Sequence, residues 1–498
     1  MTTPSTAAPP DKVESFIGGA WVGETRGHCL EVLNPATAQP VALLQEADPA
    51  EVHRAVINAR QAFDAGPWPR MDINERKDIL YRIRDRLRAH AGELADLEVL
   101  NAGIPHHHVQ GQVLRMTRNF EFFAEVASTL RGESYTQSAG FLTWVTREPR
   151  GVAALISPWN APLALSSMRV ASCIAFGNTC VLKPSEYTPL AVARMVELMH
   201  ECGLPPGVVN LVNGRGSMTG EALVSEPGID MVAFTGGTDT GRRVMASAAA
   251  RLKPSLLELG GKSANIIHED ADLERALDGA LLGIFSNNGQ QCLAGSRILV
   301  QRRIAEDFIG RFAERTRRIR VGDPMSPDTE VGPLCFQSHL ERVLGYVDLA
   351  RQEGCELLAG GARDWSAGAG FYMQPTALLA PSNSLRACQE EIFGPVAILQ
   401  VYDSLQEAIA LANDSRFGLV CYLWSASLDA AMQVSRSVRA GTIWINTPMM
   451  RELRAPFGGY KDSGIGRDGP QSSAEFFTEL KTTTVPLDPP PLRPLGRH

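Results

Sequence analysis

A single cysteine, Cys292, stands in a stretch whose residue types suit chemistry better than packing. The stretch reads NNGQQCLAGSR, so the sulfur has small, polar and turn-forming neighbours. A buried structural cysteine normally lies among apolar side chains, as Cys180 does in NTCVLKP, because an un-ionised thiol behaves as a small hydrophobe. A thiol of ordinary pKa, about 8.5, is only slightly ionised at neutral pH, so a nucleophilic cysteine needs a polarising setting or a nearby base. The pattern indicates either a spare thiol in a loop or a loop that presents a nucleophile.

Two other residues have the chemistry that such a nucleophile requires. Glu258 ends the apolar run of LLELGGKSAN, and a carboxylate in apolar surroundings has a raised pKa, which suits a general base. Asn160, in SPWNAP, lies on a turn between Pro158 and Pro162 and offers an amide donor for an oxyanion hole. Both residues also have simpler interpretations, since Glu258 could cap a following helix and asparagine is common in turns.

Two glycine-containing turns each follow a strand-like run and open a helix-like segment, in VNLVNGRGSMTGEAL and MVAFTGGTDTGRRV. Gly214, Gly216 and Gly220 are spaced one residue wider than the usual dinucleotide fingerprint, and Gly237 lies at the second helix entrance. Glycines let a backbone approach a pyrophosphate, whose charge is favoured at a helix N-terminus. Each turn by itself is equally well explained as a tight connection between strand and helix.

A charged pair, Lys183 and Glu186, closes the strand-like run VLKPSE. Ligands of open α/β sheets bind at the carboxyl ends of parallel strands, so both side chains could face a cofactor. A carboxylate that accepts ribose hydroxyls favours NAD and repels the 2′-phosphate of NADP, so Glu186 predicts NAD. The alternative is a solvated surface ion pair.

The elements that must position these residues are of two kinds. From Asp48 to about Ala127, apolar residues recur with helical spacing, as in DPAEVHRAVINARQAF. After Gly151, and again beyond Gly283, short apolar runs alternate with helix-like segments, which predicts two series of βαβ units with mostly parallel sheets. The strand-like stretches FLTWVTR and FFTELKTTTV belong to neither series and predict a small arm that pairs with another subunit.

Composition and charge argue against several other classes of protein. The chain has 498 residues, enough for more than one domain, and its net charge of −7 comes from interleaved charges, which argues against nucleic-acid or membrane partners. No apolar run reaches the roughly 18 residues of a membrane span, and MTTPSTAAPPDK does not resemble a secretory signal, so the expected location is the cytoplasm. The nine cysteines form no C-x-x-C pair, and His106, His107 and His108 would point in different directions on a helix, so no metal is expected.

Taken together, these stretches resemble a known family. PWNAP, VLKPSE, FTGGTDTG, LELGGK, NNGQQCLAGSR, EEIFGPV, GTIWINT and APFGGYKDSGIGR follow the order and spacing of the aldehyde dehydrogenase superfamily, from about Phe16 to Val485. The resemblance implies an α/β fold of two doubly wound domains with a small β oligomerisation arm, and a homodimer or homotetramer. It places the dinucleotide-binding domain at residues 13–126 and 148–259, the catalytic domain at 260–460, the arm at 127–147 and 474–487, and flexible tails at 1–12 and 488–498.

The resemblance also implies a role for each candidate residue. Cys292 matches the nucleophile, Glu258 the general base, and Asn160 the amide that holds the oxyanion together with the backbone N–H of Cys292. The implied reaction joins the Cys292 sulfur to an aldehyde carbonyl, transfers hydride to NAD, and leaves a thioester that water activated by Glu258 hydrolyses to a carboxylic acid. The residues implied to contact NAD are Ile156, Trp159, Lys183, Glu186, Gly216, Gly220, Phe234, Gly237, Leu259, Glu391 and Phe393.

The substrate is less closely specified than the reaction. Arg451 and Arg454 precede the PFGG turn, and Arg115 lies in VLRMTRNFEFFAE on an earlier helix. This arrangement resembles the hydroxymuconic and carboxymethyl-hydroxymuconic semialdehyde dehydrogenases, in which arginines at positions like Arg115 and Arg454 hold a carboxylate distant from the aldehyde. A guanidinium suits that task because it binds a carboxylate in bidentate fashion. The alternative interpretation is that these arginines form structural ion pairs, in which case aromatic or aliphatic aldehydes without a carboxylate are the substrates.

Three other classes of protein compete with this interpretation. A coenzyme A-acylating dehydrogenase generally lacks a base at the position of Glu258. A non-catalytic binding protein with this fold is expected to lose Cys292, Glu258 or Asn160, and a cysteine hydrolase would not need the paired cofactor turns. The sequence retains all of these features and therefore favours the dehydrogenase.

Overall fold

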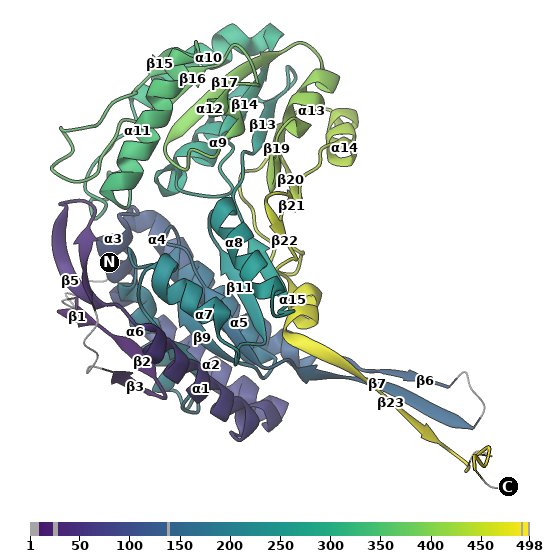
Figure 1. The fold of residues 1–498 in the computed structure, drawn as a ribbon. Coiled ribbons are helices and arrows are strands. Elements are labelled where there is room, and N and C mark those ends of the chain that lie inside the picture. The colour runs from purple at the N-terminus through teal and green to yellow at the C-terminus, as the bar shows by residue number, and fades with distance from the viewer. Residues whose placement is uncertain (1–8, 23–27, 137–139, 490–491, 497–498) are drawn as a thin grey trace.

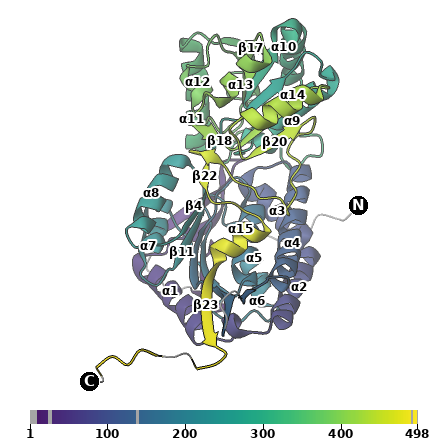
Figure 2. The ribbon, with the colours of Figure 1, turned by 90° about the vertical axis from the view of Figure 1, so that its right-hand side faces the viewer.

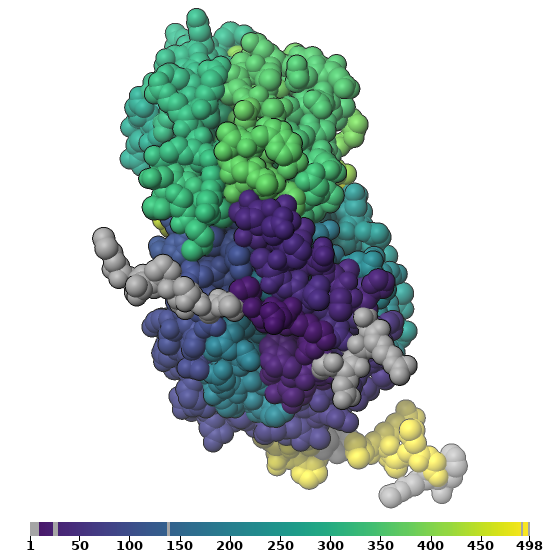
Figure 3. All heavy atoms as spheres, turned by 90° about the vertical axis from the view of Figure 1, so that its left-hand side faces the viewer, coloured from purple at the N-terminus to yellow at the C-terminus, as the bar shows by residue number. Residues whose placement is uncertain are grey.

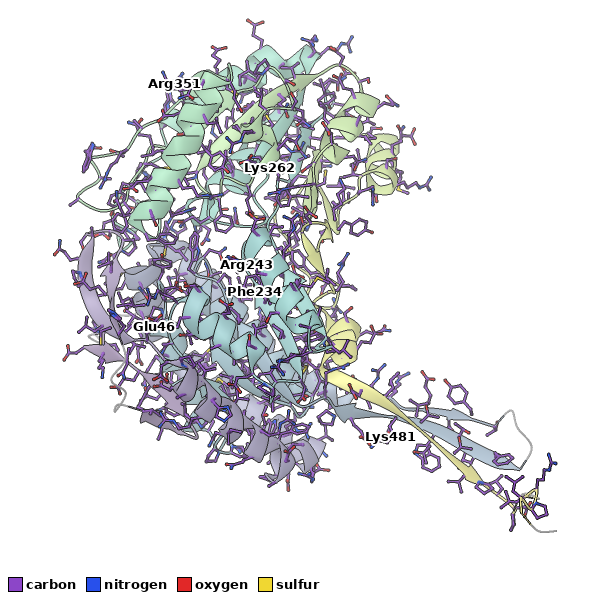
Figure 4. The ribbon with its side chains drawn as sticks, viewed as in Figure 1. Glu46, Phe234, Arg243, Lys262, Arg351 and Lys481 are labelled. Carbon is purple, nitrogen blue, oxygen red and sulfur yellow. The ribbon has the colours of Figure 1, made fainter. Side chains whose placement is uncertain are left out.

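The computed structural model describes residues 9–22, 28–136, 140–489 and 492–496. Two α/β domains lie one above the other in Figure 1, and a narrow arm leaves the lower domain. Figure 4 marks Phe234 in the lower domain, Lys262 in the upper domain and Lys481 on the arm. Both domains have the parallel, helix-covered sheets that the alternating sequence pattern predicts.

The lower domain is built on an eight-stranded sheet with the order β22-β12-β11-β8-β9-β10-β2-β3. The strands from β12 to β10 run parallel, whereas β22, β2 and β3 are antiparallel to their neighbours. The chain moves outward from β8 through β9 to β10 and then returns to β11 on the other side of β8, so the sheet is doubly wound. The strands are β2 Ser15–Ile17, β3 Ala20–Val22, β8 Val152–Ile156, β9 Thr179–Lys183, β10 Val209–Leu211, β11 Met231–Thr235, β12 Ser255–Glu258 and β22 Gly464–Ile465.

Helices cover both faces of this sheet because alternate strand residues are buried on opposite sides. In β8, Ala153 and Leu155 belong to the core shared with α2 to α6, whereas Val152, Ala154 and Ile156 belong to the core shared with α1, α7 and α8. Burial on both faces is typical of parallel strands. The helices are α1 Pro49–Asp64, α2 Ile73–Ala89, α3 Ala91–Ala102, α4 His106–Ser128, α5 Pro162–Ala175, α6 Leu190–His200, α7 Glu221–Ser225 and α8 Thr238–Ala249, with short helical turns η1 Trp68–Arg70 and η2 Gly216–Gly220.

Some of these helices begin at a capping side chain and others do not. Asp48 precedes α1 and accepts a hydrogen bond from the Glu51 N–H, which satisfies one of the unpaired N–H groups of the first turn. Asp72 caps α2 in the same way. In contrast, Ala161 precedes α5 and Pro189 precedes α6, and neither residue has a side chain that can accept.

The upper domain contains a seven-stranded sheet with the order β15-β16-β17-β14-β13-β19-β20. All neighbours are parallel except β15 and β16. After β13 and its neighbour β14, the chain crosses to the edge strand β15 and returns through β16 to β17, and then β19 and β20 extend the sheet on the other side of β13. The strands are β13 Ala264–Ile267, β14 Arg297–Gln301, β15 Glu356–Ala359, β16 Thr376–Leu379, β17 Val396–Tyr402, β19 Val420–Trp424 and β20 Thr442–Ile445. The helices are α9 Leu273–Phe285, α10 Arg302–Arg317, α11 Gln337–Gln352, α12 Arg386–Gln389, α13 Leu405–Asn413 and α14 Leu428–Ser437, and the turn η3 Ser286–Gly289 follows α9.

The arm is a three-stranded antiparallel sheet with the order β23-β7-β6. Its strands are β6 Glu133–Tyr135, β7 Phe141–Pro149 and β23 Thr478–Pro486. They extend away from the body of the molecule in Figure 1, and Figure 2 views the arm from its far end, with β23 in front. The arm starts later than the sequence boundary of residue 127, because α4 continues to Ser128, and α15 Pro470–Phe477 occupies the residues before β23. Of the expected tails, residues 1–8, 490–491 and 497–498 lie outside the described residues, and Lys12 belongs to a strand, β1 Lys12–Val13.

A small sheet near the N-terminus, with the order β1-β5-β4, was not predicted from the sequence. It consists of β1, β4 Cys29–Asn34 and β5 Gln39–Gln45, and the turn between β4 and β5 reaches the upper domain, where Pro35 O accepts from the Phe371 N–H at 2.9 Å. Figure 3 shows these purple residues in contact with the green upper domain. A second short pair, β18 Phe417–Gly418 with β21 Tyr460–Lys461, brings the chain back toward the lower domain. Among the described residues, no helix is both long and apolar enough to span a bilayer.

Candidate active site

A cavity of about 340 Å³ lies at the carboxyl edge of the lower sheet, between the two domains. The edge is where β8 and β11 end side by side while the chain connections leave in opposite directions, which is the usual ligand site of a doubly wound sheet. Cys292, Glu258 and Asn160, which are far apart in the sequence, all line this cavity. The complete lining is Pro158, Trp159, Asn160, Leu165, Thr235, Gly236, Gly237, Glu258, Leu259, Gly260, Cys292, Phe336, Ser338, His339, Arg342, Glu391 and Phe393.

The loop that carries Cys292 is held by the polar residues that precede it. Asn287 and Asn288 in η3 have left-handed backbone angles, with φ of 53° and 57°, which asparagine tolerates better than most residues. Asn287 Nδ2 donates to Asn160 O at 2.9 Å, and Asn288 Nδ2 donates to Gly103 O at 2.8 Å. The unusual composition around the sulfur therefore shapes the loop and attaches it to the lower domain.

The Cys292 thiol is protonated at neutral pH in this environment. Burial raises its pKa to about 12, and the carboxyl groups of Glu391 and Glu258 act in the same direction. The guanidinium groups of Arg451 and Arg115 oppose this shift without cancelling it. A group that accepts the thiol proton is therefore needed before the sulfur can act as a nucleophile.

Asn160 is fixed by the same loop. Its Nδ2 donates to Gln290 O at 2.8 Å, and the residue is buried. An amide nitrogen carries two hydrogens, so a second N–H is available for a ligand in the cavity. The side chain is thus a donor held in place, which is the requirement for stabilising a developing oxyanion.

Glu258 is a buried carboxylate at the end of β12. Its Oε1 is buried without a hydrogen-bond partner among the described residues. Burial raises the pKa of Glu258 to about 8, with a further contribution from the Asp468 carboxylate and an opposing one from the Arg169 guanidinium. The next element in the chain is β13, so the alternative of a helix cap does not apply. A carboxyl with this pKa is well suited to exchange protons near neutral pH.

Two half-buried arginines lie close enough to Cys292 to influence its pKa, and the sequence named only one of them, Arg115, as a substrate contact. Arg115, on α4, and Arg451, in the loop after β20, each have a buried Nε without a hydrogen-bond partner among the described residues. Burial lowers the pKa of Arg115 to about 10, and the Arg451 guanidinium acts in the same direction. Arg454 does not join them: its side chain is 78% exposed and pairs with Glu452 at 2.9 Å. The structure thus places Arg451, and not Arg454, near Cys292, because the backbone of the loop turns Arg451 inward and Arg454 outward.

The predicted ribose-binding residues form a second cluster beside the cavity. Lys183 Nζ lies 3.7 Å from Glu186 Oε2 and donates to Pro184 O at 2.9 Å. Burial lowers the pKa of Lys183, which Glu186 partly offsets, so the pair is not a solvated surface ion pair. A side chain added at Gly220 would contact the Lys183 stem, whereas Gly216, at the start of η2, faces open space.

Most of the residues predicted to contact the other parts of NAD line the same cavity as Cys292. Gly237 immediately precedes α8, and the space beside its Cα is open. Glu391 Oε1 accepts from the Gly261 N–H at 2.9 Å, and burial raises the pKa of Glu391 to about 7. Phe393 packs edge-on against Trp159 with 5.2 Å between ring centroids. Ile156 ends β8, Phe234 lies in β11, and both pack with Leu259 in one core cluster.

Several residues near the reacting groups were not predicted from the sequence. Arg169 and Asp468 form a buried ion pair, and both influence the pKa of Glu258. His339 Nε2 donates to Phe393 O at 2.7 Å. Arg169 lies in an apolar helical stretch, SSMRVASCIA, and a charge in such a stretch is a signal that a buried partner exists.

Comparisons with known proteins agree with this geometry. The family model "Aldehyde dehydrogenase family" matches residues 21–483. The 5-carboxymethyl-2-hydroxymuconate semialdehyde dehydrogenase of Escherichia coli is 43% identical over 88% of this chain and 93% of its own length. The 2-hydroxymuconic semialdehyde dehydrogenase of Pseudomonas sp. (strain CF600) is 38% identical over 96% of this chain and 100% of its own. The NAD+ complex of an aldehyde dehydrogenase from Bacillus cereus superposes with a TM-score of 0.94 at 38% identity, covering 97% of this chain and 98% of the other.

These matches extend over nearly the whole chain, and they include the cavity and the loop that carries Cys292. The predicted fold class is confirmed by the superposition. This protein belongs to the aldehyde dehydrogenase family.

Proposed function

We propose that this aldehyde dehydrogenase uses NAD and oxidises an aldehyde that carries a carboxylate distant from the reacting carbonyl. The observation that supports the proposal is the pair of half-buried guanidinium groups of Arg115 and Arg451, both close enough to Cys292 to influence its pKa. Neither has a carboxylate within ion-pair distance among the described residues, and the Nε of each is buried there without a hydrogen-bond partner. A substrate carboxylate would supply the missing charge.

The residues present fit NAD. The N-terminus of α8 at Gly237 is open and suits a pyrophosphate, and Lys183 with Glu186 suits a ribose. Glu391 and Phe393 lie on the same cavity as Cys292, where they would contact the nicotinamide ribose and ring. When bound, NAD supplies the hydride acceptor of the oxidation. Glu186 favours NAD because its carboxylate would repel the additional phosphate of NADP.

The chain's own residues then have these roles. Cys292 Sγ bonds to the carbonyl carbon after its proton passes to Glu258 or to water. The carbonyl oxygen becomes an oxyanion that accepts from Asn160 Nδ2 and from the Cys292 backbone N–H. After oxidation, the acyl group is held on Cys292 as a thioester. Glu258 takes a proton from water, the water oxygen bonds to the acyl carbon, and the sulfur leaves with the electron pair of the carbon–sulfur bond.

The names of two relatives support a substrate that carries a carboxylate. Both are named as dehydrogenases of hydroxymuconic semialdehydes. Betaine aldehyde dehydrogenases also match, at 37% and 39% identity, but two unpaired guanidinium groups would repel a cationic substrate.

The test compares adipic semialdehyde with its methyl ester, which has the same chain and no charge. Arg115→Ala and Arg451→Ala should each raise KM for the acid by about 10-fold or more, the loss of one charged contact, and leave KM for the ester nearly unchanged. Arg454→Ala is the matched control, because this arginine is exposed and pairs with Glu452. Equal effects on KM for the acid and for the ester, or a large effect of Arg454→Ala, would mean that Arg115 and Arg451 do not bind a substrate carboxylate. Activity with NADP but not NAD would contradict the cofactor assignment.

We further propose that the arm joins subunits into a homodimer or homotetramer. Its two edge strands, β6 and β23, present unpaired backbone groups, and Leu480 on β23 is 63% exposed. Exposed edges with apolar side chains are a ready template for pairing with another chain.

A further inference from the structure

The last turn of helix α3 touches three loops of the site, although α3 contributes nothing to the lining of the cavity. Glu98 and Asn101 lie three residues apart and therefore on one face of the helix. Gly103 follows directly after the helix end. Each of the three makes a hydrogen bond to a different loop.

Glu98 caps the helix that follows the oxyanion donor. Asn160 is followed by Ala161, which precedes α5 and has no side chain able to accept. The Leu163 N–H in the first turn of α5 instead donates to Glu98 Oε2 at 3.1 Å. Glu98 is 1% exposed and its other oxygen has no partner among the described residues, so this bond is its single anchor. The start of α5 is thus fixed by a residue from another helix.

Asn101 caps α6, the helix that follows Lys183 and Glu186, in the same way. Pro189 precedes α6 and cannot cap it, and the Leu190 N–H donates to Asn101 Oδ1 at 3.2 Å. Asn101 Nδ2 also donates to Tyr187 O at 2.9 Å, and Tyr187 is the residue next to Glu186. Asn101 therefore holds both the loop of Glu186 and the helix that follows it.

Gly103 holds the third loop. Its carbonyl oxygen accepts from Asn288 Nδ2 at 2.8 Å, four residues before Cys292. Gly103 has a φ of +69°, and a side chain there would collide with Pro35 and Pro333. The position thus requires glycine, and the close approach brings the carbonyl to the loop.

We propose that α3 is the positioning element of the site. Glu98 fixes the position of the oxyanion donor, Asn160, and Asn101 fixes the position of the ribose pair, Lys183 and Glu186. Each does so by capping, from α3, the N-terminus of a helix that has no capping side chain of its own. The inference rests on the proposed roles of Asn160, Lys183 and Glu186. It predicts that substitutions at two residues one helical turn apart change two different kinetic constants. Loss of the Glu98 bond displaces Asn160 and lowers kcat, whereas loss of the Asn101 bonds displaces Glu186 and raises KM for NAD.

The experiment measures kcat and KM for NAD per active site, with active sites counted by titration of the Cys292 thiol. Glu98→Ala should lower kcat by about 10- to 100-fold with KM for NAD changed by less than about 3-fold, since a shift of about 1 Å in a reacting group has that effect. Glu98→Gln should restore kcat to within about 3-fold, because its amide oxygen accepts the same bond. Asn101→Ala should raise KM for NAD by about 10-fold with kcat changed by less than about 3-fold.

Val99→Ala is the matched control, because Val99 is equally buried on α3 and its side chain is not at either cap. It should lower the melting temperature and leave both constants per active site unchanged. If Glu98→Ala and Asn101→Ala behave like Val99→Ala, α3 only stabilises the fold and the inference is wrong. The same holds if both variants change the same constant.

Asn160→Ala separates this inference from the proposed site. If Asn160→Ala leaves kcat unchanged, the oxyanion role itself is wrong. If Asn160→Ala lowers kcat by about 100-fold or more while Glu98→Ala does not lower it, the site stands and the role of α3 is refuted.

Discussion

Cys292 and Glu258, the proposed nucleophile and base, are two acids with raised pKa values that share one cavity. Burial raises the pKa of Cys292 to about 12 and that of Glu258 to about 8. The thiol thus requires a proton acceptor, and the carboxylate becomes one only as the pH approaches 8. Asn160 completes the group with a donor fixed by Gln290 O at 2.8 Å.

This arrangement predicts how the rate depends on pH. Only the ionised form of Glu258 accepts a proton from water, so thioester hydrolysis should speed up as the pH rises from about 6 to about 9, with an inflection near 8. Glu258→Gln should abolish the rise and slow hydrolysis by about 10²- to 10⁴-fold, measured by rapid-quench kinetics of the acylated enzyme. The control is Glu98→Gln, because the pKa of Glu98 is also about 8 but that residue is outside the cavity. A rise that persists in Glu258→Gln would assign the base to another group.

The same raised pKa predicts an effect on stability. Between the ordinary pKa of 4.5 and the folded value of about 8, native Glu258 keeps a proton that the unfolded chain releases. The free energy of unfolding therefore decreases as the pH rises through this range, by at most about 1.4 kcal/mol per pH unit. Glu258→Gln cannot titrate, so its stability relative to the wild type should increase by roughly 1–3 kcal/mol from pH 6 to pH 8 in urea unfolding. A constant difference across this range would mean that Glu258 is not buried as described.

At the residue scale, the sequence predicted side-chain positions correctly where a motif has a fixed geometry. It could not predict which side chain points inward where the path of a loop determines this. Cys292, Glu258 and Asn160 were predicted from their local patterns, and the structure brings them into one cavity, while their catalytic roles stay predictions. Arg451 and Arg454 precede the same turn and look alike in the sequence. The loop before them contains left-handed residues, Met449 among them, and this backbone path selects which arginine points inward.

At the scale of elements, the site depends on where strands end and helices begin. The alternation of apolar runs and helical segments predicted both parallel sheets, because two-sided burial leaves a clear pattern. The sheet of β1, β5 and β4 has no such pattern, since several of its residues are exposed and its pairing is set by distant contacts. The caps of α5 and α6 could not be predicted from the sequence either, because the capping residues lie on α3, far from both helices in the chain.

The N-terminus of α8 gives a prediction at this scale. Gly237 has a φ of −68°, which any residue can adopt, and a methyl group there meets no protein atom within 4 Å. Gly237→Ala should therefore leave the melting temperature unchanged, yet raise KM for NAD by about 10-fold, because the methyl group would occupy the space of the pyrophosphate. Gly310→Ala on α10 is the control, since Gly310 is also surrounded by open space. An unchanged KM for NAD in Gly237→Ala would place the pyrophosphate elsewhere.

At the scale of the whole molecule, the two domains and the arm divide the work. The lower domain carries Asn160, Glu258 and most of the proposed NAD residues, while the upper domain supplies Cys292 and the remaining two, Glu391 and Phe393. Figure 4 labels Phe234 in the lower domain and Lys262 in the upper domain. The arm takes no part in the cavity and projects away from it. Its strands were predicted from two stretches more than 300 residues apart, which pair along β7 and β23.

The arm predicts how the protein assembles. Leu480→Asp would place a charge on the exposed edge strand β23, so the oligomer should dissociate into smaller species in analytical ultracentrifugation. The control is Leu428→Asp on α14, an exposed leucine outside the arm, which should leave the sedimentation unchanged. Unchanged assembly in Leu480→Asp would place the subunit contact on another surface.

The most direct test of the account is mass spectrometry of Glu258→Gln after mixing with NAD and adipic semialdehyde. Because this variant should form the thioester but hydrolyse it slowly, we expect one acyl group per chain on Cys292, together with a matching burst of NADH absorbance. Cys292→Ala should give neither signal. The account is contradicted if no adduct forms on Cys292 while the wild type turns over, or if the acyl group is found on another cysteine.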